Sequence, residues 1–215
     1  MADPTKLKVF SDYVWPWCYL STGRIEKLKE DFDVEVELIH FPLHPETPDD
    51  GMSLENLFAG RNVDIEEMYS RMKGLMDAEN LEYGKRTHTY NSRLAQELGK
   101  WADEQSKNGN NYEAIHDALY RAYFVDGLNI GDKQTLIDIA TRAGLPEDDV
   151  QIVLIERTHK DAVDADWNLS REYGVTGVPT FVAGGYRLVG AQPYEALERL
   201  INDAQKPSTK DSLSW

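Results

Sequence analysis

The sequence predicts an α/β protein in which sheet-forming segments lie at both ends of the chain, on either side of a large all-helical insertion. A β-α-β pattern occupies residues 1–50, and helical periodicity dominates residues 51–159. Strands return within residues 160–205 as a β-β-α pattern. We therefore expect a discontinuous sheet domain, a helical domain inserted into it, and a flexible polar tail over residues 206–215.

The β-α-β unit of residues 1–50 is predicted from two segments with strand periodicity and a helix between them. Leu7–Ser11 alternates in polarity and indicates a strand. Pro16 suits the first turn of a helix that we expect to run to about Asp31. Val34–His40 again has the period of a strand. Three prolines within residues 42–48 exclude a helix or a central strand there, so an extended connection is expected.

The middle of the chain shows repeated helical signals. Asp64 begins a capping-box pattern, and the methionines that follow it at helical spacing indicate a core-facing stripe. Glycine and asparagine over residues 107–111 interrupt the helical pattern. The expected helices run from Asp64 to Met76, from Ser92 to Glu104, from Tyr112 to Val125, from Asp132 to Ala143, onward from Pro146, and through Val163 to a stop at Gly174.

The last unit is a hairpin followed by a helix. Pro179–Ala183 and Tyr186–Val189 read as two strands joined by the two-residue turn Gly184–Gly185, and Pro193 opens the last helix. A β-α-β half and a β-β-α half with helices between them describe a thioredoxin-like fold with a large all-helical insertion.

The charge and composition of the chain exclude some classes of partner and favour one location. The net charge of −15 argues against nucleic acid or an anionic membrane as partner, because both are polyanions. The charge fits a soluble surface, and a high-salt environment is the alternative. The first residues lack the apolar run of a signal peptide, so a cytoplasmic location is expected. The single cysteine excludes an internal disulfide.

A four-residue motif, Trp15-Pro16-Trp17-Cys18, lies between the first predicted strand and the helix and contains this cysteine. A Cys-x-x-Cys motif at such a junction is the redox centre of thioredoxin-like proteins. Its first cysteine is the nucleophile, because the helix N-terminus stabilises the thiolate, and the second resolves the mixed disulfide. Cys18 occupies the second position and Trp15 the first, so these are the candidate catalytic positions. Taken alone, Cys18 can be interpreted either as a small buried hydrophobic residue or as a reactive thiol that has been retained.

The second candidate element is the proline that precedes the hairpin. At this place in a thioredoxin-like sheet a proline is expected to be cis and to lie beside the redox helix, whereas the ordinary alternative is a trans proline at a strand start. The preceding backbone would then pair with an extended substrate segment. We expect Cys18 to be shielded and Trp15 to face this turn from the helix tip. The predicted substrate-binding residues are Pro16, Trp17, Val178 and Pro179.

Three stretches together resemble the DsbA-like thioredoxin family, and within it the cytoplasmic FrnE-like branch, in which the centre reads C-P-W-C-Y. They are Phe10–Leu20, Val175–Phe181 and Gly190–Pro193, and the similarity extends from Leu7 to Ile201. The resemblance implies a thiol-disulfide oxidoreductase or isomerase that acts on thiol- or disulfide-bearing proteins or small molecules. It implies no resident cofactor, with glutathione as an optional co-substrate.

Related proteins of the same architecture are the kappa-class glutathione transferases and the 2-hydroxychromene-2-carboxylate isomerases. They have serine at the position of Trp15 and bind glutathione. This chain departs from both patterns, because tryptophan neither attacks a disulfide nor hydrogen-bonds a glutathione thiolate. A two-cysteine cycle within one chain is excluded, since Cys18 has no partner cysteine.

Two functions remain open. The first is a thiol-disulfide oxidoreductase with a degenerate W-P-W-C centre, in which Trp15 is native or stands in place of cysteine or of selenocysteine, whose UGA codon some systems read as tryptophan. The alternative is a glutathione-binding isomerase- or transferase-like protein, or a non-catalytic binding module. His40 and His44 give no metal site, because Pro42 between them excludes a helix. The oligomeric state, including a dimer, stays open.

Overall fold

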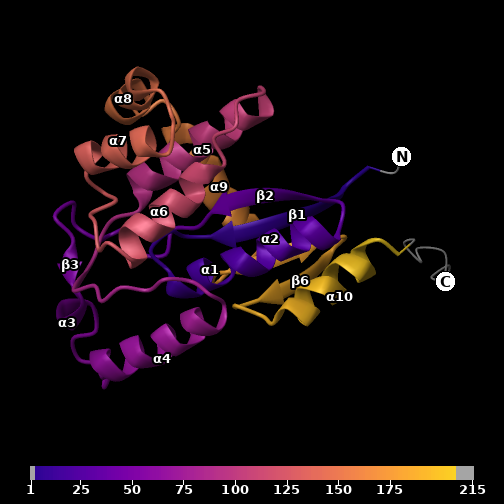
Figure 1. Ribbon diagram of the computed structural model, residues 1–215, viewed down its shortest axis with the longest axis horizontal. Helices are drawn as coiled ribbons and strands as arrows, with labels where there is room; N and C mark the ends of the chain where they lie inside the picture. Colours follow the sequence, from indigo (N-terminus) through magenta and orange to yellow (C-terminus); the bar gives the residue numbers. More distant parts are fainter. Residues whose placement is uncertain (1–2, 207–215) are drawn as a thin grey trace.

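The computed structural model describes residues 3–206, so the tail expected to be flexible lies outside the described residues from position 207 onward. A four-stranded mixed sheet has helices on both faces, and a group of helices sits at one end of it (Figure 1). The strands of this sheet are β1 (Thr5–Ser11), β2 (Val34–His40), β5 (Thr180–Ala183) and β6 (Tyr186–Val189), and a second small sheet pairs β3 (Met52–Ser53) with β4 (His88–Thr89). The helices are α1 (Pro16–Leu20), α2 (Thr22–Asp31), α3 (Leu54–Leu57), α4 (Ile65–Ala78), α5 (Arg93–Lys107), α6 (Ala114–Phe124), α7 (Lys133–Arg142), α8 (Glu147–Glu156), α9 (Lys160–Glu172) and α10 (Tyr194–Ala204).

The main sheet joins the two ends of the chain. Its strand order is β2-β1-β5-β6, with β1 parallel to β2 and antiparallel to β5. Leu7 is opposite Val36, and Val9 is opposite Phe181. The prediction of a thioredoxin-like sheet built from two distant halves is therefore confirmed.

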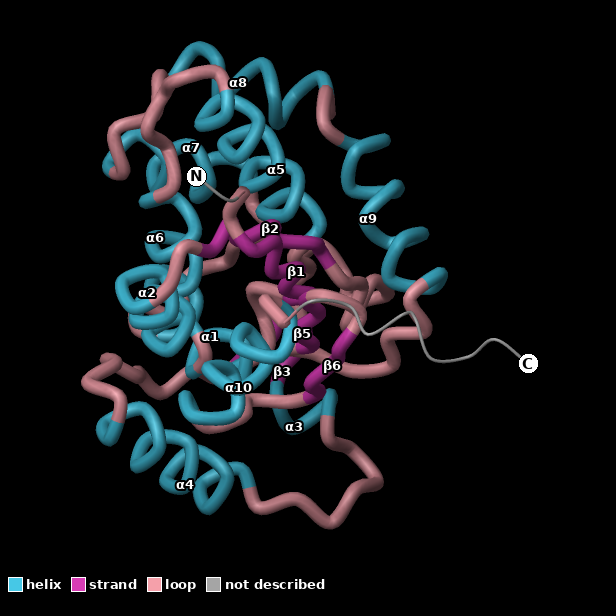
Figure 2. The backbone as a smooth tube through the Cα atoms, turned by 90° about the vertical axis from the view of Figure 1, so that its right-hand side faces the viewer, coloured by secondary structure: helices cyan, strands magenta, loops and turns pink. Residues whose placement is uncertain are grey.

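The period-two alternation along β1 separates two apolar layers. Leu7 and Val9 pack with Leu28 of α2 and Leu197 of α10 on one face. Phe10 points to the other face, where its ring lies 5.4 Å from that of Tyr173, just after α9. In Figure 2, α9 accordingly stands on one side of the strands, and α2 and α10 stand on the other.

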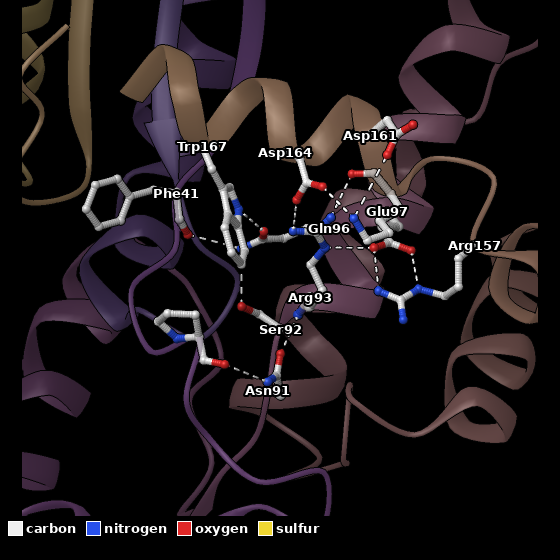
Figure 3. A network of polar contacts seen from close by, with 12 residues as sticks. Phe41, Asn91, Ser92, Arg93, Gln96, Glu97, Arg157, Asp161, Asp164 and Trp167 are labelled. Carbon is white, nitrogen blue, oxygen red and sulfur yellow. Dashed lines mark hydrogen bonds and ion pairs between the residues drawn. The ribbon is translucent and has the colours of Figure 1, made fainter. Parts of the chain in front are cut away.

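A buried ion cluster holds α5 to the segment that joins α8 and α9 (Figure 3). Glu97 of α5 is fully buried and accepts hydrogen bonds from Arg93 at 2.7 Å and from Arg157 at 2.6 Å. The Arg93 guanidinium also lies 4.5 Å from the centre of the Trp167 ring in α9. These contacts fix α5 against α9, which covers one face of the sheet.

The predicted helix starts are largely confirmed. The Asp64 side chain caps α4 by accepting from Glu66 N and Glu67 N, and Asp132 caps α7 by accepting from Thr135 N at 2.8 Å. The single helix predicted from Pro16 to Asp31 is wrong, because the structure divides it at Ser21.

The physical reason for the division is competition for backbone carbonyls. The Ser21 hydroxyl donates to Trp17 O, and the Thr22 hydroxyl donates to Tyr19 O, both at 2.8 Å. Such back-bonding by serine and threonine bends a helix. The pairing of β3 with β4 was not predicted, since two-residue strands are too short to show a period. Among residues 3–206, no helix has the length and apolar character needed to cross a membrane.

Candidate functional site

Cys18 lies in the first turn of α1, three residues after Trp15, which is the N-cap. Pro16 follows the cap and fits there because it has no N–H to satisfy and a φ suited to a helix start. Cys18 N donates to Trp15 O at 3.0 Å, and the Cys18 side chain is 2% exposed. The Trp15 side chain makes no cap hydrogen bond. The sulfur is therefore shielded from solvent, at the position that the second cysteine of a Cys-x-x-Cys motif would occupy.

The surroundings of Cys18 favour the protonated thiol. Burial raises its pKa to about 12, and the Ser11 side chain and the Asp12 backbone offset only part of that rise. The negative charge of Asp12 acts in the same direction as burial. Cys18 is thus mostly protonated at neutral pH, and it reacts slowly unless a nearby positive charge stabilises its thiolate.

Two hydroxyl groups lie next to Cys18. Ser11 Oγ and Tyr120 Oη are 2.7 Å apart, and each residue is 4% exposed. Burial raises the pKa of Tyr120 well above its usual value, and the nearby Cys18 adds to the rise. Tyr120 comes from α6, so a helix far from the motif in the sequence contributes directly to the environment of the thiol.

Asp12 fixes the loop that precedes the motif. Its carboxylate is 1% exposed and accepts from Val14 N at 3.2 Å and from Leu43 N at 3.1 Å. Burial raises the pKa of Asp12, whereas these backbone hydrogen bonds and one with the Ser92 side chain lower it in part. This carboxylate connects the end of β1 to the segment after β2.

The turn before β5 is built from buried residues. Val178 and Pro179 are both buried, and the peptide bond between them is cis. Pro179 O accepts from Gly190 N at 2.7 Å, which joins the turn to the segment after β6. Arg24 of α2 donates to Gln192 O in that segment at 2.7 Å. The turn, the segment after β6 and α2 are therefore held together.

A groove of about 800 Å³ brings two of the predicted site residues together. Cys18 and Pro179 both line it, although they are far apart in the sequence. Trp15 and Trp17 are half-buried and Pro16 and Val178 are buried, and none of these four is among the described residues that line the groove.

Ser11 and Tyr120 were missed by sequence reasoning. Ser11 has a local signal, because it ends β1 just before the motif. Tyr120 has none, because it lies 109 residues away from Ser11 on a helix of ordinary apolar pattern.

A second polar cluster lies on the wall of the same groove. His116 is hydrogen-bonded through Nδ1 to the Tyr13 hydroxyl at 2.7 Å and through Nε2 to Asp103 at 2.9 Å. Burial acts to raise the pKa of Asp103, but the hydrogen bond and charge of His116 outweigh it, so the pKa is lowered. His40 is 1% exposed, and burial lowers its pKa to about 3, which keeps its ring neutral.

Comparison with known proteins agrees with this geometry. The family described as the DSBA-like thioredoxin domain matches residues 6–202. The uncharacterized protein YwbO of Bacillus subtilis (strain 168) is 30% identical over 206 residues, which cover 93% of this chain and 97% of YwbO.

Two solved structures extend the comparison. The probable DsbA oxidoreductase SCO1869 of Streptomyces coelicolor superposes with a TM-score of 0.85 at 29% identity, covering 98% of this chain and 93% of that one. A 2-hydroxychromene-2-carboxylate isomerase superposes with a TM-score of 0.68 at 15% identity, covering 92% of this chain and 95% of the other. The second likeness shows a shared fold.

Proposed function

The chain belongs to the DsbA-like thioredoxin family, and from this premise we propose that it is a thiol-disulfide oxidoreductase whose centre has Trp15 in the place of the nucleophile. The observation that supports the proposal best is the position of Cys18. It lies one turn inside a strand-to-helix junction and shares a groove with Pro179. This is the place of a resolving thiol.

The high pKa of Cys18 supports the same assignment of roles. A resolving thiol works on a mixed disulfide that is already formed, so it needs proximity more than acidity. The attacking thiol belongs at the N-cap, where the first backbone N–H groups of the helix lie. Trp15 occupies that position, so the chain as it stands has an inner thiol without an attacking partner.

The substrate is a thiol- or disulfide-bearing protein or small molecule, with Pro16, Trp17, Val178 and Pro179 as its contact residues. Within the described chain, the backbone N–H and C=O of Val178 make no hydrogen bond. They are therefore free to pair with an extended segment, as in strand addition. We place the protein in the reducing cytoplasm, where a lone cysteine stays a thiol.

Insulin reduction in the presence of dithiothreitol tests the proposal. The wild-type chain is expected to be near background, and Trp15→Cys is expected to gain clear turnover because it supplies the attacking thiol. Trp15→Ser is the matched control, since it removes the same indole without adding a sulfur. Full activity of the wild-type chain, or equal activity of the cysteine and serine variants, would show that the roles are wrongly assigned.

A glutathione-binding protein without dithiol chemistry is the second candidate, because a protein of the same fold, the cytosolic disulfide reductase DsbM of Pseudomonas aeruginosa, was solved with GSH (TM-score 0.60). Titration calorimetry with reduced glutathione separates the two. Micromolar binding together with an inactive Trp15→Cys variant would favour this candidate. The codon at position 15 of the native gene separates tryptophan from selenocysteine, because only the latter is encoded by UGA under the standard code.

A further inference from the structure

The groove that contains Cys18 runs along the unpaired edge of β2. β2 is the outermost strand of the sheet, and residues 34–38 form one wall of the groove. The other walls come from α2, α5 and α6, so the groove lies between the edge of the sheet and these three helices. Its volume of about 800 Å³ falls within the usual range for small-molecule sites. This entrance is distinct from the surface formed by Trp15 and Trp17, which do not line the groove.

The described residues that line the groove carry a strong excess of negative charge. Eight of their side chains are carboxylates, whereas three are lysines. One of the lysines, Lys100, is already paired at 2.6 Å with Asp166, which lies outside the groove. Lys29 is shared between Glu26 at 3.2 Å and Glu113 at 3.4 Å. The positive side chains therefore do not neutralise the groove.

Three of the carboxylates have no ion-pair partner among residues 3–206, and all three are exposed. They are Asp33 just before β2, Glu35 on β2 and Asp117 on α6, so Glu35 and Asp117 come from two different walls of the groove. Burial and the neighbouring negative charge of Glu26 raise the pKa of Asp117. An added positive charge between these walls would relieve that repulsion.

The buried residues that line the groove differ in chemistry from its exposed carboxylates. They include Cys18 and the hydroxyl groups of Ser11 and Tyr120, and Val9 and the half-buried Ile25 supply an apolar lining. A molecule that fits both parts of this lining has a cationic group for the carboxylates and a short apolar arm that carries sulfur toward Cys18.

We propose that this groove binds a cationic small-molecule disulfide, which exchanges with Cys18 from the β2 side of the site. The proposal rests on the thiol-disulfide function proposed above and names a substrate class for the same thiol. The Cys18 thiolate attacks one sulfur of the disulfide, so that a new S–S bond forms while the original S–S bond breaks. The departing thiolate takes up the proton that Cys18 has lost, and the disulfide itself is the oxidant. A cation bound nearby also favours the thiolate form of Cys18.

Rates of Cys18 modification by three disulfides test the proposal. The probes are cystamine, which is a dication, neutral 2-hydroxyethyl disulfide, and the dianion 3,3′-dithiodipropionate. Intact mass gives the rate of mixed-disulfide formation, and division by the rate on the chain unfolded in guanidinium chloride removes the intrinsic reactivity of each probe. We expect the corrected rate for cystamine to exceed that for dithiodipropionate by about tenfold or more at low ionic strength, and the gap to narrow in high salt.

Two double variants test whether the difference between the cystamine and dithiodipropionate rates arises from the carboxylates of the groove. Asp117→Asn combined with Glu35→Gln is expected to shrink the gap by about threefold or more, since both carboxylates line the groove. Asp148→Asn combined with Glu67→Gln changes the net charge equally at exposed positions outside the groove, and is expected to leave the gap as in the wild type. Equal corrected rates for the three probes would overturn the proposal, and so would a gap that both variant pairs change alike. This measurement needs no thiol at position 15, so its outcome is separate from that of the insulin test.

Discussion

The hydroxyl groups of Ser11 and Tyr120 form a buried hydrogen bond of 2.7 Å that joins the end of β1 to α6 beside the Cys18 thiol. One partner belongs to the sheet and the other to a helix 109 residues further along the chain. The environment of the thiol therefore depends on how α6 packs against the sheet, although the motif Trp15–Cys18 itself is local in the sequence.

Ser11→Ala is predicted to slow the alkylation of Cys18. The Ser11 side chain lowers the pKa of the thiol against the effect of burial, so its loss should leave less thiolate at any given pH. The measurement is the pH dependence of the iodoacetamide rate. Tyr120→Phe is the control, because it keeps the Ser11 hydroxyl. It should cost about 1 kcal/mol of unfolding free energy without slowing alkylation. Equal slowing in both variants would contradict the role given to Ser11.

Glu97→Gln is predicted to destabilise the fold by roughly 2–4 kcal/mol, because it removes the shared carboxylate of Arg93 and Arg157 at a fully buried position. Urea unfolding measures the loss. Glu104→Gln, on the same helix, removes a carboxylate that is 63% exposed and pairs with His159, so it should change stability by less than about 0.5 kcal/mol. A loss for Glu97→Gln as small as that for Glu104→Gln would show that the cluster in Figure 3 does not hold the helices together.

His40 is predicted to make stability fall in mild acid. Its pKa is lowered from 6.5 to about 3 in the folded chain, so between these values the unfolded chain binds a proton that the folded chain does not. Stability should therefore decrease as pH falls, by about 1 kcal/mol between roughly pH 7 and 5.5.

The matched variant is His40→Phe, which keeps an aromatic ring next to Tyr13 but cannot titrate. Unfolding free energies at the two pH values should differ by about 1 kcal/mol less in this variant than in the wild type. An unchanged difference would mean that other groups cause the pH dependence.

The sequence was sufficient for the parts of the fold that depend on local signals. Strand β2 was predicted with its observed bounds, the cap at Asp64 was recognised, and the strand-to-helix position of Cys18 followed from the flanking pattern. These features are encoded within a few residues of one another. The division of the first helix at Ser21 was not predicted, because helical periodicity continues through it while two side-chain hydroxyls compete for the carbonyls.

The parts of the site that depend on long-range contacts could not be predicted. Tyr120 has no motif that marks it as a neighbour of Cys18, and its position follows from how α6 packs over α1. The groove was not predicted either, because it is formed by an edge strand and three helices from separate regions of the chain. The excess of acidic residues was visible in the sequence, but its concentration along the groove that contains Cys18 was not.

The most direct test of the central claim is whether a cysteine at position 15 forms a disulfide with Cys18. The Trp15→Cys variant, oxidised gently and then treated with iodoacetamide under denaturing conditions, should lose the mass of two hydrogen atoms and take up no alkyl group. The same sample reduced beforehand should take up two. If the oxidised variant instead keeps two alkylatable thiols, Trp15 does not occupy the nucleophile position of a DsbA-like centre.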